Sequence, residues 1–388
     1  MNNKPDTKIL YISDVPVTLY HSGTTIMYRL FEDLTDDKLV IFQGMKLNVK
    51  NQLPNLKYTY YQPLAINLKT TRFKEVYLLL NIFRNYFFVP RQLSKLFSET
   101  KPNVIVTVSY NLLWILAYRF AKRKKIPFVL LVHDDIDAHI SKDFFANKLL
   151  NYLFGFIYKN ANARFSISPL MNKVYSDKYQ IQGDVLFPLQ PKVFIPPADE
   201  ESSNKKYLTY AYAGTLDTGV YVDMLIRLSR LLESISGNIF VYSNSFPDTL
   251  SQQKNIIYKG FVSPDELLNR LNIEADVLFV PFSFHNKNID LAFPSKIVDY
   301  SMIKKPLFIW APLTSAVAIW YQSLDYPVGI LLTETENDNS LSESINNLCN
   351  YENRRIWGAN SYIAGKAFFE NSKQKSIFYN KIENCLKS

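Results

Sequence analysis

The chain has 388 residues, of which 47% are hydrophobic and 20% are charged. This length fits two domains of ordinary size, and the composition excludes a disordered chain. No apolar run reaches the roughly 18 residues that a membrane-spanning helix needs. The polar start MNNKPDTKILYISDV also lacks the apolar core of a signal peptide. We therefore expect a globular protein in the cytoplasm.

The net charge of +9 predicts an anionic partner. Nucleotides, anionic lipids and nucleic acids all fit this charge, but no nucleic-acid-binding motif is present, so we expect no nucleic-acid partner. Two cysteines, Cys349 and Cys385, are too few for a disulfide framework, and no metal-ligand spacing occurs. We therefore expect no bound metal.

The first half alternates short apolar strands with helical patterns, which favours an α/β doubly wound sheet. The predicted strands are Lys8–Ser13, Leu39–Phe42, Val104–Val108, Pro127–Val132, Arg164–Ser168 and Asp184–Pro188. The predicted helices are Gly23–Leu34, Phe73–Ser98, Leu112–Lys124, Lys142–Lys159 and Pro169–Lys178.

A proline-rich segment, PLQPKVFIPPADEESSNKK at residues 188–206, interrupts this alternation and is typical of a linker. It divides the chain into predicted domains at residues 1–190 and 207–358, joined by a linker at residues 191–206. Residues 359–388 are predicted to form a C-terminal helix that crosses back to the first domain.

The alternation resumes after the linker and predicts a second doubly wound sheet. The predicted strands are Tyr207–Ala213, Ile239–Ser243, Ile256–Tyr258, Val277–Pro281 and Leu307–Trp310. A helical stripe begins near Tyr221 and ends before Gly237, and Ser263-Pro-Asp-Glu266 is a capping box that opens a short helix. Residues 342–388 are predicted to form helices.

The segment FPSKIVDYSMIKKP at residues 293–306 predicts an anion site between two of these strands. Ser295 is a good N-cap type, and a helix N-terminus offers unpaired N–H groups to a phosphate. Lys296 adds a positive charge, and Asp299 lies on the same helix face, where a carboxylate can hold ribose hydroxyls. By spacing alone, an ordinary capped helix with a surface Lys–Asp pair is the better explanation, and the flanking strands shift the balance toward the anion site.

The order of these motifs resembles the donor-binding half of GT-B glycosyltransferases related to the retaining enzymes of family 4. The motifs are Gly214 after a strand, Tyr258-Lys-Gly-Phe-Val262, Ala275-Asp-Val-Leu-Phe-Val-Pro281, and Phe293 to Tyr300 with Lys305-Pro306. The resemblance implies two tandem Rossmann-like domains facing a cleft. It further implies retaining, metal-independent transfer of a sugar from a nucleotide-sugar donor, without a cofactor. The implied acceptor is a saccharide or a lipid-linked sugar of surface polysaccharide or glycolipid assembly.

The resemblance also implies roles for particular residues. In the second domain, Asp299 holds the ribose. The diphosphate faces Ser295, Lys296 and the backbone at Phe293 and Pro294, and it lies near Gly214 and Thr215. The base lies near Tyr258 to Val262, a segment that includes Gly260. In the first domain, Gly23 belongs to a small-residue loop against which substrate packs. His133 approaches the transferred sugar, with Asp134 beside it as a further catalytic candidate.

Two departures from the family pattern leave other functions open. The family has a second acidic residue eight positions before Asp299, where this chain has Leu291, with Asp290 adjacent. The family also has an Arg and a Lys after the strand that ends at Gly214, and the segment 215–219 has neither. A non-catalytic GT-B subunit and a nucleotide-sugar epimerase on the same scaffold are therefore alternatives.

Two further features allow more than one interpretation. Asp135-Ile-Asp137 matches a metal-binding D-x-D, or these carboxylates cap the next helix. Residues 69–101 mix five internal cations with seven aromatic side chains, which is typical of a helix that lies on an anionic membrane or of a core-packing helix. We therefore include an anionic membrane surface among the partners, with a peripheral location at its inner face.

Overall fold

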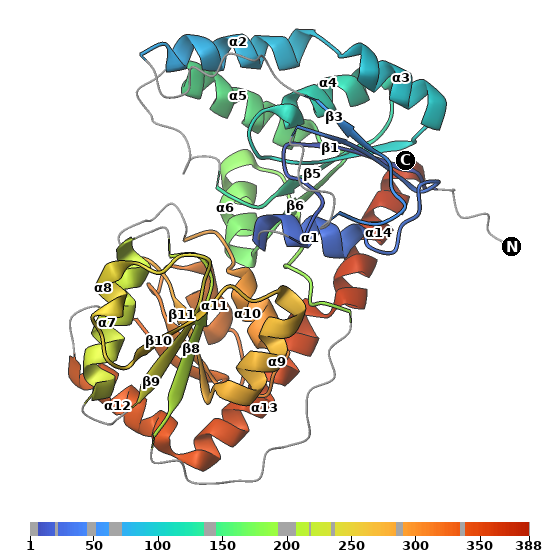
Figure 1. Ribbon diagram of the computed structural model, residues 1–388. Helices are drawn as coiled ribbons and strands as arrows, with labels where there is room; N and C mark the ends of the chain where they lie inside the picture. The colour runs from blue at the N-terminus through green and yellow to red at the C-terminus, as the bar shows by residue number, and fades with distance from the viewer. Residues whose placement is uncertain are drawn as a thin grey trace, which may run out of the picture. The chain divides into compact units, whose positions relative to one another are not determined.

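Two parallel sheets organise the chain, which the computed structural model describes at residues 7–19, 22–44, 52–61, 72–135, 145–192, 207–216, 219–233, 237–284, 290–333 and 338–387. Each sheet belongs to its own compact unit. The first unit comprises residues 1–188 and 371–388, and the second comprises residues 189–370 (Figure 1). Of the predicted linker, residues 193–206 lie outside the described residues.

The first unit contains a seven-stranded sheet within the described residues. In spatial order its strands are β3 (Tyr58–Tyr60), β2 (Leu39–Gln43), β1 (Ile9–Ser13), β4 (Val104–Val108), β5 (Phe128–Val132), β6 (Ala163–Ser166) and β7 (Asp184–Val185). Its helices are α1 (Ser22–Phe31), α2 (Lys74–Phe87), α3 (Arg91–Thr100), α4 (Leu113–Lys124), α5 (Phe145–Asn160), α6 (Pro169–Tyr179) and α14 (Asn371–Lys387). Every residue of β1, β2, β4 and β5 is buried, as expected for parallel strands covered on both faces.

The second unit repeats the same topology with six strands among its described residues. In spatial order these are β10 (Ile256–Gly260), β9 (Asn238–Tyr242), β8 (Thr209–Ala213), β11 (Val277–Pro281), β12 (Leu307–Trp310) and β13 (Gly329–Leu332). Its helices are α7 (Gly219–Glu233), α8 (Asp248–Ser251), α9 (Pro264–Glu274), α10 (Ser295–Tyr300), α11 (Ala316–Gln322), α12 (Asp338–Cys349) and α13 (Tyr351–Phe369). The predicted α/β doubly wound architecture is therefore confirmed for both halves of the chain.

Both sheets reverse their strand order at one point. The reversal lies between β1 and β4 in the first sheet and between β8 and β11 in the second. At such a point the connections leave to opposite sides, which opens a crevice at the carboxyl ends of the strands. This crevice is where a doubly wound sheet binds its ligand.

Local signals in the sequence explain several helix ends. Ser168 and Ser263 cap α6 and α9, each side chain accepting a backbone N–H three residues later, and a proline follows each cap. The predicted single helix Phe73–Ser98 is wrong, since α2 ends at Phe87 and α3 begins at Arg91. Pro90 explains the break, because proline excludes the residue before it from the helical conformation.

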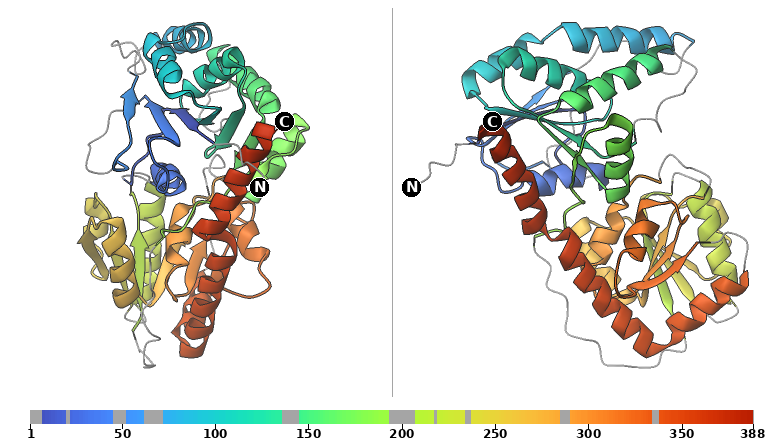
Figure 2. Two further views of the ribbon diagram at one scale, coloured as in Figure 1. Left: turned by 90° about the vertical axis from the view of Figure 1, so that its right-hand side faces the viewer. Right: turned by 180° about the vertical axis from the view of Figure 1, so that it is seen from behind.

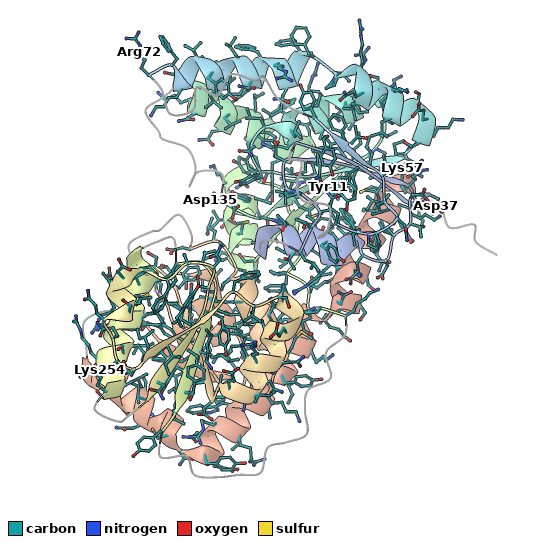
Figure 3. The ribbon with its side chains drawn as sticks, viewed as in Figure 1. Tyr11, Asp37, Lys57, Arg72, Asp135 and Lys254 are labelled. Carbon is teal, nitrogen blue, oxygen red and sulfur yellow. The ribbon has the colours of Figure 1, made fainter. Side chains whose placement is uncertain are left out.

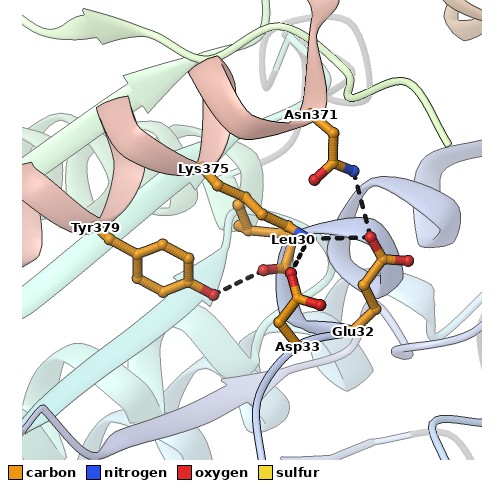
Figure 4. A network of polar contacts seen from close by, with 6 residues as sticks. All are labelled: Leu30, Glu32, Asp33, Asn371, Lys375 and Tyr379. Carbon is orange, nitrogen blue, oxygen red and sulfur yellow. Dashed lines mark hydrogen bonds and ion pairs between the residues drawn. The ribbon is translucent and has the colours of Figure 1, made fainter. Parts of the chain in front are cut away.

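The last helix, α14, belongs to the first unit, whereas α13, which ends at Phe369, belongs to the second. It packs on α1 and β6, which lie far from it in the sequence (Figure 2). Lys375 forms ion pairs with Glu32 at 2.9 Å and Asp33 at 2.7 Å, just beyond the end of α1 (Figure 4). The hydroxyl of Tyr379 donates to the carbonyl of Leu30 at 2.7 Å. These contacts anchor α14 to α1.

We expect Lys375→Ala to lower the free energy of unfolding by about 2 kcal/mol, because it leaves the mostly buried Glu32 carboxylate without its cation. The side chains of Lys375 and Glu32 are only 11% and 17% exposed. The matched control is Lys381→Ala on the same helix, whose pair with Asp184 is 40% and 37% exposed. That change should cost about 0.5 kcal/mol. Urea denaturation of both variants measures the difference, and equal losses would contradict the prediction.

Candidate functional site in the second sheet

The end of β8 lies at the reversal of strand order in the second sheet. Gly214 follows this strand with a φ of +150°, a conformation that side chains rarely adopt. Its N–H donates to the carbonyl of Tyr242 at 3.0 Å. The N–H of Ala213 donates to the hydroxyl of Tyr300 at 2.8 Å. Because Tyr300 is the last residue of α10, this bond ties the strand end to the helix that carries the predicted anion site.

Lys296 extends from α10 to this strand end. Its Nζ lies 4.3 Å from the ring centroid of Tyr212 and 5.4 Å from that of Tyr221. A Cβ on Gly214 would lie 3.4 Å from the same Nζ. The hydroxyl of Tyr212 donates to the carbonyl of Thr215 at 2.7 Å. The structure therefore brings Lys296 to the strand end at Gly214 and Thr215, at least 81 residues earlier in the sequence.

The ammonium of Lys296 has an unusual environment. Two aromatic rings, rather than water, surround much of it, although the residue remains partly exposed. Burial lowers the pKa of Lys296 to about 7, because desolvation disfavours the charged form. An anion placed beside Gly214 would raise this pKa again and would gain a strong charge–charge interaction.

The start of α10 differs from the sequence prediction. Ser295 is the first helical residue and not the N-cap, which is Pro294. The helix is also short and ends at Tyr300, with further turns at 301–304. Asp299 is half-buried on α10, one turn beyond Lys296. Lys296 and Asp299 are therefore on the helix that the sequence predicted, but Ser295 does not cap it.

The loop before α10 is anchored by its aromatic residue. Phe293 is buried, and its ring packs against Trp320 at 5.8 Å and Phe369 at 5.4 Å between centroids. Its side chain therefore belongs to the core, and only the backbone at Phe293 and Pro294 remains available to a ligand. Asp290, near the position of the acid that the family carries, accepts a hydrogen bond from Thr314 at 3.1 Å.

A stacked aromatic pair lies at the carboxyl end of β10. The rings of Tyr258 and Phe246 are 4.6 Å apart and nearly parallel, with 19° between their planes. Tyr258 is 42% exposed, and its hydroxyl donates to the carbonyl of Ser243 at 2.9 Å. Gly260 follows with a φ of +77°. Because one strand separates β10 from β8, the two strand ends lie about 10 Å apart, a distance that suits the base and the diphosphate of one nucleotide.

In the first unit, the predicted residues gather at the end of β5. His133 is 9% exposed, and burial lowers its pKa to about 4 although the charge of Asp134 opposes the shift. The imidazole is therefore neutral at neutral pH. Asp135 accepts a hydrogen bond from Tyr175 at 2.8 Å; Figure 3 labels this carboxylate. Asp137 of the D-x-D pattern lies outside the described residues.

Gly23 lies in the first turn of α1. A Cβ added there would meet nothing within 4 Å. The fold itself therefore tolerates a side chain at this position, and any requirement for glycine would come from a ligand. Within the described residues, no group of three or more His, Cys, Asp or Glu side chains is arranged as a metal site.

Sequence reasoning missed Asp14, which follows β1 at the reversal of the first sheet. Its Oδ2 accepts the N–H groups of Leu112 and Leu113 at 3.1 and 2.9 Å, at the start of α4. It also missed the roles of Tyr212 and Phe246. An acid directly after the first strand was a usable signal for Asp14. The tyrosine and phenylalanine gave none, because aromatic residues are frequent throughout this chain.

Comparisons with known proteins agree with this geometry. Residues 59–186, all in the first unit, match the model of Glycosyltransferase Family 4. A glycosyltransferase from Rickettsia africae ESF-5 superimposes with a TM-score of 0.68 at 11% identity, over 98% of this chain and 99% of that one. HepE from Anabaena in complex with UDP and glucose gives 0.64 at 10% identity, over 97% and 99%.

The lipopolysaccharide outer core galactosyltransferase WaaB has a TM-score of 0.61 at 16% identity, over 97% of this chain and 99% of that one. The chain has the GT-B fold. The resemblance to family-4 glycosyltransferases that the sequence indicated is therefore confirmed. No curated protein matches the sequence. At identities this low, the GT-B neighbours establish only the fold. The chemistry of this protein has to be inferred from its own residues.

Proposed function

We propose that this protein is a glycosyltransferase that takes a sugar from a nucleotide-sugar donor bound at the carboxyl edge of the second sheet. The observation that carries the proposal is the position of Lys296, whose ammonium lies beside Gly214 on the faces of two tyrosine rings. The complexes of HepE with UDP and with UDP-glucose support a uridine diphosphate donor.

The chemistry of glycosyl transfer suits this arrangement. Negative charge develops on the leaving diphosphate, and a fixed cation in a site with little water stabilises that charge most effectively. In this proposal Lys296 contacts the diphosphate, and the backbone at Gly214 and Thr215 approaches it without a side chain in the way. Asp299 holds the ribose, and the Phe246–Tyr258 pair lies against the base.

We assign the first unit to the acceptor and the transferred sugar. His133 is neutral at neutral pH and can donate or accept a hydrogen bond to a sugar hydroxyl. Asp134 lies beside it, and Gly23 leaves room for substrate at the start of α1. As the family resemblance implies, we propose transfer with retention and without a metal or another cofactor. Ser295, Phe293 and Pro294 contribute backbone contacts to the diphosphate.

We further propose that the acceptor is a saccharide or a lipid-linked sugar and that the protein works at the inner face of a membrane. The name of WaaB, an outer core galactosyltransferase of lipopolysaccharide, supports an acceptor of this kind. No helix among the described residues has the length and hydropathy to cross a bilayer.

A panel of donors tests the proposed reaction. UDP-, GDP- and dTDP-sugars are incubated with the protein, and release of the nucleoside diphosphate is followed with and without added acceptor sugars. We expect slow release from one nucleotide class and faster release with an acceptor. Binding of a nucleotide without any release would instead favour a non-catalytic subunit, which the missing Arg and Lys after Gly214 make the second candidate. Conversion of the donor sugar without release would favour an epimerase.

Donor binding should weaken as the pH rises, because the pKa of Lys296 in the free protein is about 7. The ammonium is nearly fully present at pH 6 and mostly lost at pH 8, so affinity for a UDP-sugar should fall about tenfold between them. The charge on a UDP-sugar is constant over this range, so the change belongs to the protein. Titration calorimetry measures it. Lys296→Met should bind the UDP-sugar weakly at both pH values. If the affinity of this variant fell with pH as much as that of the wild type, the pH dependence would belong to another group.

A further inference from the structure

Helix α2 exposes an apolar stripe to the outside of the first unit. The stripe consists of Phe73, Val76, Leu80, Phe83 and Phe87, which are 47%, 53%, 54%, 49% and 63% exposed. Their spacing of three and four residues places them on one side of the helix. Phe83 and Phe87 stack on each other at 6.2 Å. We call this set of residues the α2 stripe. Because solvent-exposed helix faces normally carry polar side chains, we expect the α2 stripe to contact an apolar partner.

The packed face of α2 is only partly apolar. Asn81 and Asn85 are 4% and 8% exposed on the side that packs against α4 and α5. Each amide satisfies its donor by bonding to the helix's own backbone, to the carbonyls of Tyr77 and Asn81 at 2.8 Å. Ile82, at 1% exposed, is buried between them. The packed face of α2 therefore combines one isoleucine with two asparagines, while its outward face exposes large apolar side chains along the length of the helix.

The charges around the α2 stripe are predominantly positive. Residues 72–101 hold six Lys or Arg and two acidic residues, a net charge of +4. The carboxylate of Glu75 accepts the N–H of Ala146 at 3.2 Å, which directs it toward α5. The other acid, Glu99, lies 3.8 Å from Lys95. Arg72 and Lys74 are exposed at the start of α2, where Figure 3 labels Arg72 at the edge of the first unit.

The neighbouring helix α5 extends the surface. Phe145, Tyr152 and Phe156 are 65%, 70% and 43% exposed, and their spacing again places them on one side of their helix. The exposed Lys148 and Lys159 lie on the same side. Since α5 packs against α2, the two helices offer aromatic and cationic side chains together.

We propose that the α2 stripe docks on an anionic lipid bilayer, with its phenylalanines in the interfacial region and the flanking cations at lipid phosphates. A second copy of the chain would also offer an apolar partner, but it would bring the same net charge of +4 against the stripe. An anionic bilayer matches both the apolar and the cationic parts. The inference rests on the peripheral location proposed above and names the surface responsible for it.

Sedimentation with vesicles tests the proposal. Wild-type protein should bind vesicles of phosphatidylglycerol and phosphatidylcholine mixed equally, and bind pure phosphatidylcholine at least tenfold less. Leu80→Ser/Phe83→Ser should lower the partition coefficient on the mixed vesicles at least tenfold. Arg72→Glu/Lys74→Glu should lower it at low salt and much less at high salt, because salt screens the attraction to the phosphates.

Matched controls change exposed residues of the second unit. Ile273→Ser/Ile363→Ser removes two apolar side chains that are 73% and 53% exposed, and Lys254→Glu reverses an exposed charge. Both should bind like wild type. Thermal unfolding checks that each variant is folded, and affinity for UDP in the absence of vesicles checks the donor site separately.

The outcomes distinguish this inference from the proposed reaction. Equal vesicle binding by wild type and Leu80→Ser/Phe83→Ser would overturn the α2 stripe as the docking surface. Absence of wild-type binding to anionic vesicles would overturn both the docking and the peripheral location, while unchanged UDP binding would leave the donor site intact. A wild-type dimer that becomes a monomer in Leu80→Ser/Phe83→Ser, without vesicle binding, would show that a second copy covers the stripe.

Discussion

Replacing Lys296 by alanine is expected to lower turnover about 100- to 1,000-fold, which corresponds to about 3–4 kcal/mol of transition-state stabilisation. The ammonium is the one cation among the described residues that lies beside both Gly214 and the rings of Tyr212 and Tyr221. If it stabilises the leaving diphosphate, its loss acts mainly on the transition state. Steady-state kinetics with the donor identified by the panel measures the effect.

The same change should not destabilise the fold. The pKa of Lys296 is lowered, so the folded protein holds the proton less tightly than the unfolded chain does. Below pH 7 the buried ammonium therefore opposes folding, and this cost disappears as the pH rises from 7 toward the unfolded pKa. Lys296→Ala should unfold at the same urea concentration as wild type or a higher one at pH 6. Lys254→Ala, an exposed position, is the matched control for both measurements.

Two outcomes would remove Lys296 from the mechanism. Wild-type turnover in Lys296→Ala would make the residue a surface cation. A loss of turnover accompanied by a large loss of stability would make it a packing residue, since the aromatic contacts with Tyr212 and Tyr221 would then be its main contribution.

Gly358→Ala is expected to lower the free energy of unfolding of the second unit by about 3 kcal/mol, because α13 has no room for a side chain there. A Cβ at Gly358 would overlap the carbonyl oxygen of Lys304 and lie 2.8 Å from its carbonyl carbon. Gly365, two turns later, would similarly meet Ser301. Both contacts are with the turns that follow α10. The two glycines therefore let α13 approach the segment that carries Lys296 and Asp299.

Because backbone atoms cannot rotate away, the alanine must displace α13 or the turn at Lys304. We therefore also expect affinity for the donor to fall about tenfold, since small displacements of binding groups have large effects. Urea denaturation and calorimetry measure the two changes. Gly219→Ala in α7 of the same unit is the control, because a Cβ there meets nothing within 4 Å. Equal stability of the two variants would contradict the predicted close packing.

Local patterns in the sequence predicted much of the fold. Fully apolar runs such as Val277–Pro281 and Leu307–Trp310 became buried parallel strands, because a strand covered on both faces needs apolar residues at every position. The caps at Ser168 and Ser263 were equally visible. The strand β3 (Tyr58–Tyr60) was missed, since a half-buried strand of three residues carries too few positions for a period to show.

The sequence alone determined the type and order of most elements, and it marked the segment FPSKIVDYSMIKKP as the place to look for an anion. These properties depend on nearest neighbours in the chain and on hydrophobic period. The tertiary structure decided the rest. In the folded protein the N-cap of α10 is Pro294 and not the predicted Ser295, and Lys296 lies against Tyr212, Tyr221 and Gly214. Contacts between residues more than 70 positions apart leave no local pattern, so only the folded sheet could bring this cation to the end of β8.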